Sequence, residues 1–130
     1  MYTHICISSN DLDVSQKFYD AALTPLGIKS AGPINERACM YSSDGGTLLV
    51  IKPADEAEAS YANGGTIGFA AADAAAVDAF HAAGLANGGT DEGAPGKRPQ
   101  APGNAYGAYL RDPVGNKICA FCQLPEGELN

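Results

Sequence analysis

Two residues of this chain could do chemistry if folding brought them together: His4 near the start and Cys119 near the end. An imidazole can act as a general base or a metal ligand. A thiol becomes a nucleophile when a neighbouring cation favours its thiolate form, so the two could make a Cys–His pair. Each also has a structural alternative, a hydrogen-bonded cleft or core histidine and a buried inert thiol. Both residues lie in strand-like segments, so the arrangement of the strands determines whether the two side chains come close together.

Cys119 also begins a Cys119-Ala-Phe-Cys122 motif, a spacing found in redox and zinc sites. The motif falls in an apolar segment typical of a strand, and strand side chains three positions apart face opposite sides of the sheet. Redox pairs of this spacing usually lie at a helix N-terminus, which is not expected here. We therefore expect free thiols at all four cysteines, Cys6, Cys39, Cys119 and Cys122.

Basic residues are scarce, so those near a cleft are candidates to meet a ligand. Lys97-Arg98 lies in a Gly/Pro-rich segment expected to border a cleft, where it could contact an anionic group or remain solvated. Arg37 is expected on a middle strand, either in the cleft or at an edge. Tyr106 and Tyr109 are three apart on one strand, hence on opposite faces, and Tyr106 is the candidate that we place in the cleft.

The first half of the chain reads as a strand, a helix and three further strands. Residues 2–8 are rich in β-branched and apolar types, and Ser8-Ser9-Asn10-Asp11 follows with side chains that can cap a helix. Apolar residues then recur near helical spacing until Pro25 and Gly27 end the pattern. Strands are expected at 28–31, 37–41 and 47–51, with a hairpin turn before the last.

The second half starts the pattern again. Residues 66–71 read as a strand and Asp73 as a helix N-cap. His81 is expected on the surface of the helix that follows. Residues 92–104, rich in Gly and Pro, are expected to be a loop. Strands at 106–111 and 116–123 are joined by a turn at 112–115.

The two halves align when one is shifted by 62 positions, which places Asp11 on Asp73 and Phe18 on Phe80. This shared register predicts an internal duplication. One half-barrel of a strand, a helix and three strands cannot bury both faces of its sheet. Two such units must therefore associate, with a concave cleft between them.

The bulk composition excludes several classes of partner. The chain has 130 residues, enough for one domain with a real core, and a formal net charge of −7. An anionic surface repels nucleic-acid and lipid phosphates and favours a cationic or neutral guest. No apolar run approaches the roughly 20 residues of a membrane helix, and the N-terminus has no secretion signal. We expect a cytoplasmic protein.

The chain resembles the vicinal oxygen chelate superfamily of glyoxalases, bleomycin-resistance proteins and extradiol dioxygenases. The resemblance covers nearly the whole chain, and its most specific block is Tyr106 to Pro113 followed by Gly115-Asn116-Lys117. Weaker matches are Thr3-His4-Ile5, Phe18-Tyr19-Asp20 and residues 76–84. The resemblance implies an α+β fold with two βαβββ modules around a cleft that commonly holds a divalent metal. The modules would be 1–53 and 66–124, with a linker at 54–65 and a tail at 125–130.

This sequence differs from the family pattern at the positions of the metal ligands. The resemblance implies one ligand on the first and one on the fourth strand of each module, positions held here by His4, Leu49, Thr66 and Cys119. Metal-binding relatives usually carry His or Gln in place of Thr66 and Glu in place of Cys119. A divalent site needs three or four converging donors, and Leu49 supplies none. We therefore predict no resident metal, with a divalent ion as the alternative.

Two functional hypotheses remain. In the first, the protein is a metal-free member of the superfamily that binds a small molecule in the cleft, lined by His4, Leu49, Thr66, Cys119, Arg37 and Tyr106. In the second, it is a lyase, isomerase or dioxygenase that uses an unusual metal site or the His4 and Cys119 pair. A homodimer is expected in either case, because a domain of this size gains by covering exposed strands.

Overall fold

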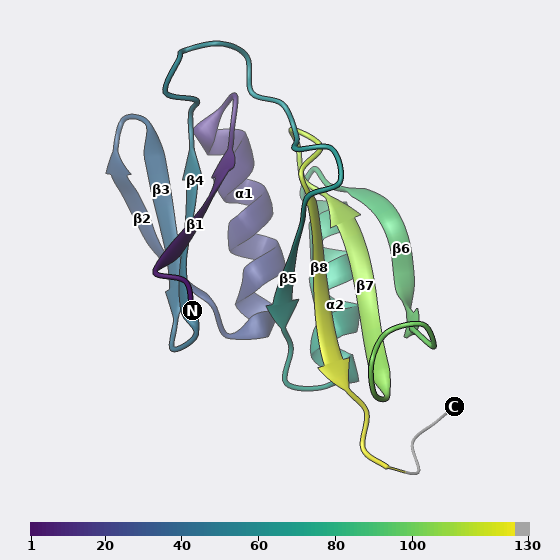
Figure 1. Ribbon diagram of the computed structural model, residues 1–130. Coiled ribbons are helices and arrows are strands. Elements are labelled where there is room, and N and C mark those ends of the chain that lie inside the picture. The colour runs from purple at the N-terminus through teal and green to yellow at the C-terminus, as the bar shows by residue number, and fades with distance from the viewer. Residues whose placement is uncertain (127–130) are drawn as a thin grey trace.

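The computed structural model describes residues 1–126 as two sheets and two long helices (Figure 1). The first half contains strand β1 (His4–Ser8), helix α1 (Leu12–Leu23), a short 3₁₀ helix (Thr24–Leu26), and strands β2 (Lys29–Asn35), β3 (Ala38–Ser43) and β4 (Gly46–Ile51). The second half contains β5 (Thr66–Ala70), α2 (Ala74–Ala86), β6 (Thr90–Lys97), β7 (Ala105–Arg111) and β8 (Lys117–Gln123). Each half is a βαβββ module, so the expected α+β fold class is confirmed. The predicted tail at 125–130 lies mostly outside the described residues.

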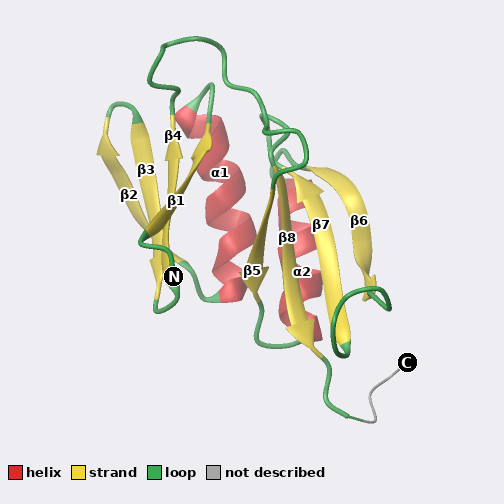
Figure 2. Cartoon of the chain, in the orientation of Figure 1, coloured by secondary structure: helices red, strands yellow, loops and turns green. Residues whose placement is uncertain are grey.

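Each module forms its own four-stranded sheet, with the same strand order in both (Figure 2). The first sheet has the order β1-β4-β3-β2 and the second β5-β8-β7-β6. In both, the first strand pairs parallel with the fourth, and the remaining pairs are antiparallel. The two sheets are separate, which leaves β1 and β5 as edge strands in the described chain. We call the face of each sheet that its helix does not cover the open face.

The duplicated helix starts have the same physical cause. The side chain of Asp11 accepts hydrogen bonds from the backbone N–H groups of Asp13 and Val14, at 3.0 and 3.3 Å. Asp73, 62 positions later, accepts one from Ala76 N–H at 2.9 Å. Both carboxylates satisfy donors that the first helical turn leaves free, and their charge suits the positive end of the helix dipole.

The segment expected to be a loop at 92–104 is partly a strand, which corrects the prediction. β6 occupies residues 90–97 and pairs with β7, with two register irregularities around Gly93 and Gly96. Glycine and Pro95 have low strand propensity, so the local pattern of residues did not predict the element. β6 is the edge strand of its sheet, where a proline costs no ladder hydrogen bond on the solvent side.

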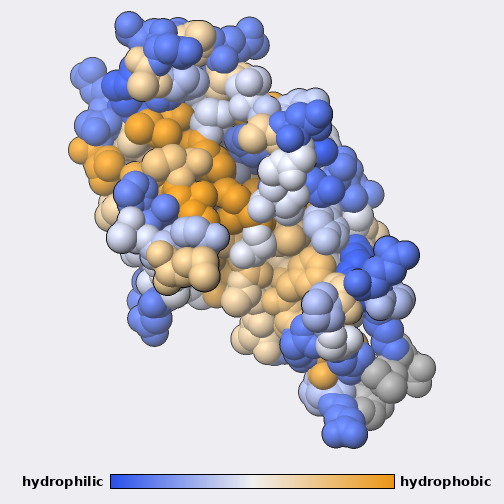
Figure 3. Space-filling model, viewed as in Figure 1, coloured by the Kyte–Doolittle hydropathy of each residue, from blue (hydrophilic) through white to orange (hydrophobic). Residues whose placement is uncertain are grey.

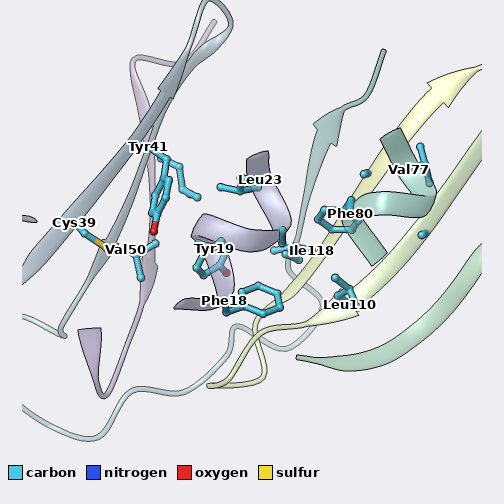
Figure 4. Packing of buried hydrophobic residues seen from close by; sticks show 14 of the residues in the cluster. Phe18, Tyr19, Leu23, Cys39, Tyr41, Val50, Val77, Phe80, Leu110 and Ile118 are labelled. Atoms are coloured by element: carbon cyan, nitrogen blue, oxygen red, sulfur yellow. The ribbon is translucent and has the colours of Figure 1, made fainter. Parts of the chain in front are cut away.

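The modules are joined through their helices, and one continuous core runs from the first sheet to the second. Figure 4 shows Tyr41 and Val50 of the first sheet, then Phe18 and Tyr19 of α1, then Phe80 of α2 and the second sheet behind it. All five side chains are almost completely buried. Phe18 packs directly against the second module: its ring lies so close to Gly84 and Gly89 that a Cβ added at either position would press on it.

A buried carboxylate holds the same boundary. Asp112 accepts a hydrogen bond from the hydroxyl of Tyr19 at 2.6 Å and another from the side-chain amide of Asn116 at 2.9 Å. Its second oxygen accepts from the backbone N–H groups of the turn at 114–116. The Asn116 amide also donates to the carbonyl of Ser8 in the first module, at 3.0 Å. The segment that carries the most specific part of the family resemblance, residues 106–117, therefore contributes hydrogen bonds that hold the two modules together.

The helices of the described chain are too short or too polar to cross a membrane.

Candidate functional site

The four positions to which the resemblance assigns metal ligands fall in two pairs, one on each sheet. His4 and Leu49 belong to the neighbouring strands β1 and β4, where Leu49 lies opposite Cys6. Thr66 and Cys119 belong to β5 and β8, where Cys119 lies opposite Gly68. Because strand side chains alternate, and Leu48, Val50, Ile118 and Ala120 point into the core, all four positions lie on open faces.

Within one chain these two pairs are on separate sheets. No hydrogen-bonded ladder joins β1 to β5 in residues 1–126, and the modules meet through α1 and α2 instead. His4 is exposed, and its Nδ1 lies 2.9 Å from the hydroxyl oxygen of its neighbour Thr3. Within residues 1–126, no hydrogen bond joins His4 to Cys119. The chain by itself thus provides no Cys–His pair.

The thiol of Cys119 is also in the wrong protonation state for a nucleophile. Burial raises its pKa to about 11, and the positive charges of Lys117 and Arg98 offset only part of that effect. At pH 8 a thiol with this pKa is about 0.1% thiolate. Burial likewise raises the pKa of Cys39 and of Cys122. These three cysteines behave as small apolar side chains.

The donors at the four positions do not fit a divalent metal. Leu49 has no donor atom, the Thr66 hydroxyl is a poor ligand, and a neutral buried thiol must lose its proton before it can ligate. Across the part of the chain that the structure describes, no three His, Cys, Asp or Glu side chains are close enough to share an ion.

Two of the predicted cleft residues lie elsewhere. Tyr106 is on the helix-covered face of β7, where its hydroxyl donates to Asp78 of α2 at 2.7 Å. Arg37 is in the turn between β2 and β3 rather than on a middle strand, and its guanidinium donates to the carbonyls of Lys52 and Pro53. Both placements correct the prediction, and both side chains serve packing between elements.

His81 is the other residue whose surroundings differ from the expectation. It is 8% exposed rather than on the helix surface, and its Nε2 lies 2.8 Å from Asp91 of β6. The hydrogen bond from His81, followed by one from the Gly93 N–H, lowers the pKa of the Asp91 carboxyl. This contact ties α2 to the edge strand β6 of its own module.

The two open faces differ in character. On the first sheet, Leu49 and Met40 lie opposite each other on β4 and β3, and Figure 3 shows an apolar area over these strands and β1. On the second sheet, the equivalent face carries Tyr109 and Phe121, whose rings meet edge to face with centroids 5.7 Å apart. Tyr109, opposite Cys119, is the tyrosine that occupies the position predicted for Tyr106. The alternation of strand side chains predicted that either Tyr106 or Tyr109 would lie on the open face, but it did not determine which of them.

Two open hollows of the surface lie away from these faces. One, of about 430 Å³, is bordered by Tyr61 and by the turn at 111–115. The other, of about 570 Å³, lies beside the linker and is bordered by Arg37 and Glu56. Arg111 beside the first hollow is already paired, since it contacts Glu92 at 3.3 Å and the carbonyl of Gly115 at 3.0 Å. Neither hollow contains any of the four open-face positions.

The thiols give a direct check of this electrostatic picture. At pH 8, iodoacetamide should label Cys6, which is exposed on the open face of β1, and leave Cys39, Cys119 and Cys122 largely unlabelled over the same time. Peptide mass spectrometry would measure the extent at each site. A Cys6→Ser variant is the control and should lose the rapid labelling. Rapid labelling of Cys119 in the folded protein would contradict the assignment.

Solved structures place this chain among known proteins. A glyoxalase/bleomycin resistance protein from Albidiferax ferrireducens T118 is 48% identical, with a TM-score of 0.86 over 96% of this chain and 99% of that one. A glyoxalase-related enzyme from Fulvimarina pelagi is 17% identical, with a TM-score of 0.75 over 93% and 86%. A lactoylglutathione lyase from Agrobacterium tumefaciens is 22% identical, with a TM-score of 0.63 over 93% and 92%. No protein-family model and no curated protein matches.

The first of these similarities extends over nearly the full length of both chains at high identity, so it shows the family, whereas the other two show the fold alone. This chain belongs to the glyoxalase/bleomycin resistance protein family, and the resemblance to the vicinal oxygen chelate superfamily is confirmed.

Proposed function

We propose that this protein binds a small organic molecule on its open sheet faces, in the cytoplasm, without a resident metal. One observation carries the proposal. The positions of the family's metal ligands hold Leu49 and a thiol whose pKa is about 11, while the same faces present apolar and aromatic side chains. Such surfaces contact organic molecules through dispersion and the hydrophobic effect and need no ion.

The name of the 48% identical relative joins two functions, glyoxalase and bleomycin resistance. A glyoxalase reaction moves a proton beside a carbonyl and needs a base near an electrophile. In the described residues, no three His, Cys, Asp or Glu side chains come close enough together to supply such a base and the ligands of an electrophilic ion. Binding without turnover is the function that these residues support best.

We further propose that the protein is a homodimer whose second copy completes the ligand cleft. The modules of one chain meet through their helices, so β1 and β5 keep one edge without a ladder partner in the described chain. Free strand edges are templates for pairing with another chain. Pairing of β1 with β5 of a second copy would bring the open face of the first sheet beside that of the second sheet.

The proposal is tested with untagged protein in three measurements. Elemental analysis before and after incubation with zinc, nickel, manganese and iron should find only substoichiometric metal after dialysis. Light scattering should give about twice the chain mass of 13.3 kDa. A small-molecule screen followed by amide chemical shifts should find binders whose shifts cluster at His4, Leu49, Thr66 and Cys119.

A His4→Ala variant tests whether any bound metal depends on this histidine. On our proposal it keeps the fold and has no effect on the metal content, because there is no site to lose. Near-stoichiometric metal that survives dialysis and disappears in His4→Ala would overturn the metal-free proposal. Binders that shift only residues remote from both open faces would overturn the assignment of the site.

A further inference from the structure

The basic residues of this acidic chain are unevenly placed. Eight Lys and Arg face fifteen Asp and Glu in the sequence as a whole. Four of the eight lie on or beside strands β6, β7 and β8 of the second sheet, at Lys97, Arg98, Arg111 and Lys117. A net charge of −7 therefore does not describe the potential at this sheet.

Two of these cations converge on one aromatic ring of the open face. The guanidinium carbon of Arg98 lies 5.6 Å from the ring centre of Tyr109, and the ammonium nitrogen of Lys117 lies 5.1 Å from it. Both distances are within the range of cation–π attraction. Both charges also act on the thiol of Cys119, whose pKa they lower against the larger effect of burial.

Neither cation has a carboxylate partner among residues 1–126. The ion pairs found there are His81 with Asp91 and Arg111 with Glu92. Arg111, on the same strand as Tyr109, is thus neutralised, whereas Arg98 and Lys117 each lie beside the Tyr109 ring without such a partner. A cation without a carboxylate partner keeps its donors available for the oxygens of a bound anion.

Arg98 is held in place before any ligand arrives. Its guanidinium donates to the backbone carbonyls of Ala94 at 2.7 Å and Lys97 at 3.3 Å. It lies over Gly93 and Gly96, where an added Cβ would come within 3.4 Å of its nitrogens. A guanidinium has five N–H groups, so these two bonds leave donors free for an anionic oxygen. Gly93 and Gly96, which carry no side chain, thus leave the space that the Arg98 side chain occupies.

The first module has no such arrangement. Tyr109 pairs with Cys119 in the second sheet as Met40 pairs with Leu49 in the first, and Lys117 corresponds to Thr47. The cation and aromatic group are thus not a consequence of the duplication. The second sheet carries cations and aromatic rings on its open face, whereas the open face of the first sheet is apolar (Figure 3).

We propose that the open face of the second sheet binds the anionic group of a small organic acid through Arg98 and Lys117, with a flat apolar part of that molecule against Tyr109 and Phe121. This inference rests on the proposed function, since it specifies the chemical class of ligand for the same faces. It also replaces the expectation from net charge, which favoured a cationic or neutral guest. Local charge decides because screening weakens the field of distant carboxylates beyond about 10 Å.

The test uses three probes of the same shape and different charge: benzoate, benzamide and benzamidine. Amide chemical shifts of the ¹⁵N-labelled full chain would be followed during each titration at low salt. Benzoate should shift the amides of Arg98, Tyr109 and Cys119 and bind on the order of tenfold more tightly than benzamidine. Its affinity should fall as salt is raised, because the contact is between charges.

Matched variants localise the charge. Arg98→Met and Lys117→Met remove one cation each and keep a long side chain, and each should weaken benzoate binding on the order of fivefold. Lys17→Met removes the same charge from the exposed surface of α1 and should leave the affinity unchanged. Dispersion of the amide spectrum would verify that each variant is folded.

The outcomes separate this inference from the proposed function. If benzamide or benzamidine shifts the open-face residues as strongly as benzoate, the faces bind organic molecules but the anionic class is wrong. The anionic class is equally wrong if Lys17→Met weakens benzoate as much as Lys117→Met does. If none of the three probes shifts any open-face residue, both the inference and the proposed function are overturned.

Discussion

Replacing Asp112 by alanine should lower the free energy of unfolding by about 3–4 kcal/mol, one of the largest effects of any single substitution in this chain. Asp112 is only 4% exposed, and its two oxygens accept hydrogen bonds from Tyr19, Asn116 and three backbone N–H groups. Alanine would leave the Tyr19 hydroxyl buried without its acceptor, and a buried unpaired polar group costs about 1–3 kcal/mol.

Urea unfolding followed by far-ultraviolet circular dichroism would measure this effect, since the chain has no tryptophan. Asp44→Ala in the exposed turn between β3 and β4 is the matched control and should change stability by less than about 0.5 kcal/mol. Combining Asp112→Ala with Tyr19→Phe should cost less than the sum of the two separate losses, because the second change removes the orphaned hydroxyl. If the two losses of stability were strictly additive, the hydrogen bond between Tyr19 and Asp112 would not be the source of the stability that Asp112 contributes.

Phe18→Ala should destabilise the protein by about 3–5 kcal/mol, the usual cost of truncating a fully buried aromatic side chain. Phe18 belongs to α1, yet its ring packs where Gly84 and Gly89 of the second module leave space. Its edge-to-face contact with Tyr19, with ring centres 4.8 Å apart, would be lost as well. The cavity would lie at the boundary between modules, so both should loosen together.

The control for this prediction is Val14→Ala on the same helix, where the valine is 47% exposed and little changes in packing. Amide hydrogen exchange would report which strands lose protection in Phe18→Ala. We expect faster exchange in both β4 and β8, because the core is continuous across α1 and α2. A loss below about 1 kcal/mol, or exchange confined to the first module, would show that the helices do not hold the modules together.

Several features of the fold follow from local sequence and could be predicted. Asp11 and Asp73 precede helices because a carboxylate at that position satisfies free N–H groups, whatever the rest of the chain does. The shift of 62 positions predicted two similar modules, since equal patterns of apolar residues bury equal faces. Strand alternation predicted that Tyr106 and Tyr109 face opposite sides, which the structure confirms.

Other features depend on partners that a local pattern does not contain. β6 is a strand because β7 supplies its hydrogen bonds, although its own glycines and proline disfavour an extended ladder. His81 is buried because β6 packs against α2 and places Asp91 within hydrogen-bond distance of its ring. Arg37 was a candidate for the cleft, but its guanidinium donates to the backbone carbonyls of Lys52 and Pro53.

By itself, then, the sequence determined the α+β class, the duplicated modules, the helix starts and the poor set of metal donors, because each depends on residue type and on neighbours a few positions away. Tertiary structure alone decided that His4 and Cys119 lie on separate sheets and that Arg98 and Lys117 converge on Tyr109. The physical reason is that alternation assigns side chains to two faces without telling which face a helix will cover. The packing of each helix on its own sheet made that choice, and with it the character of each open face.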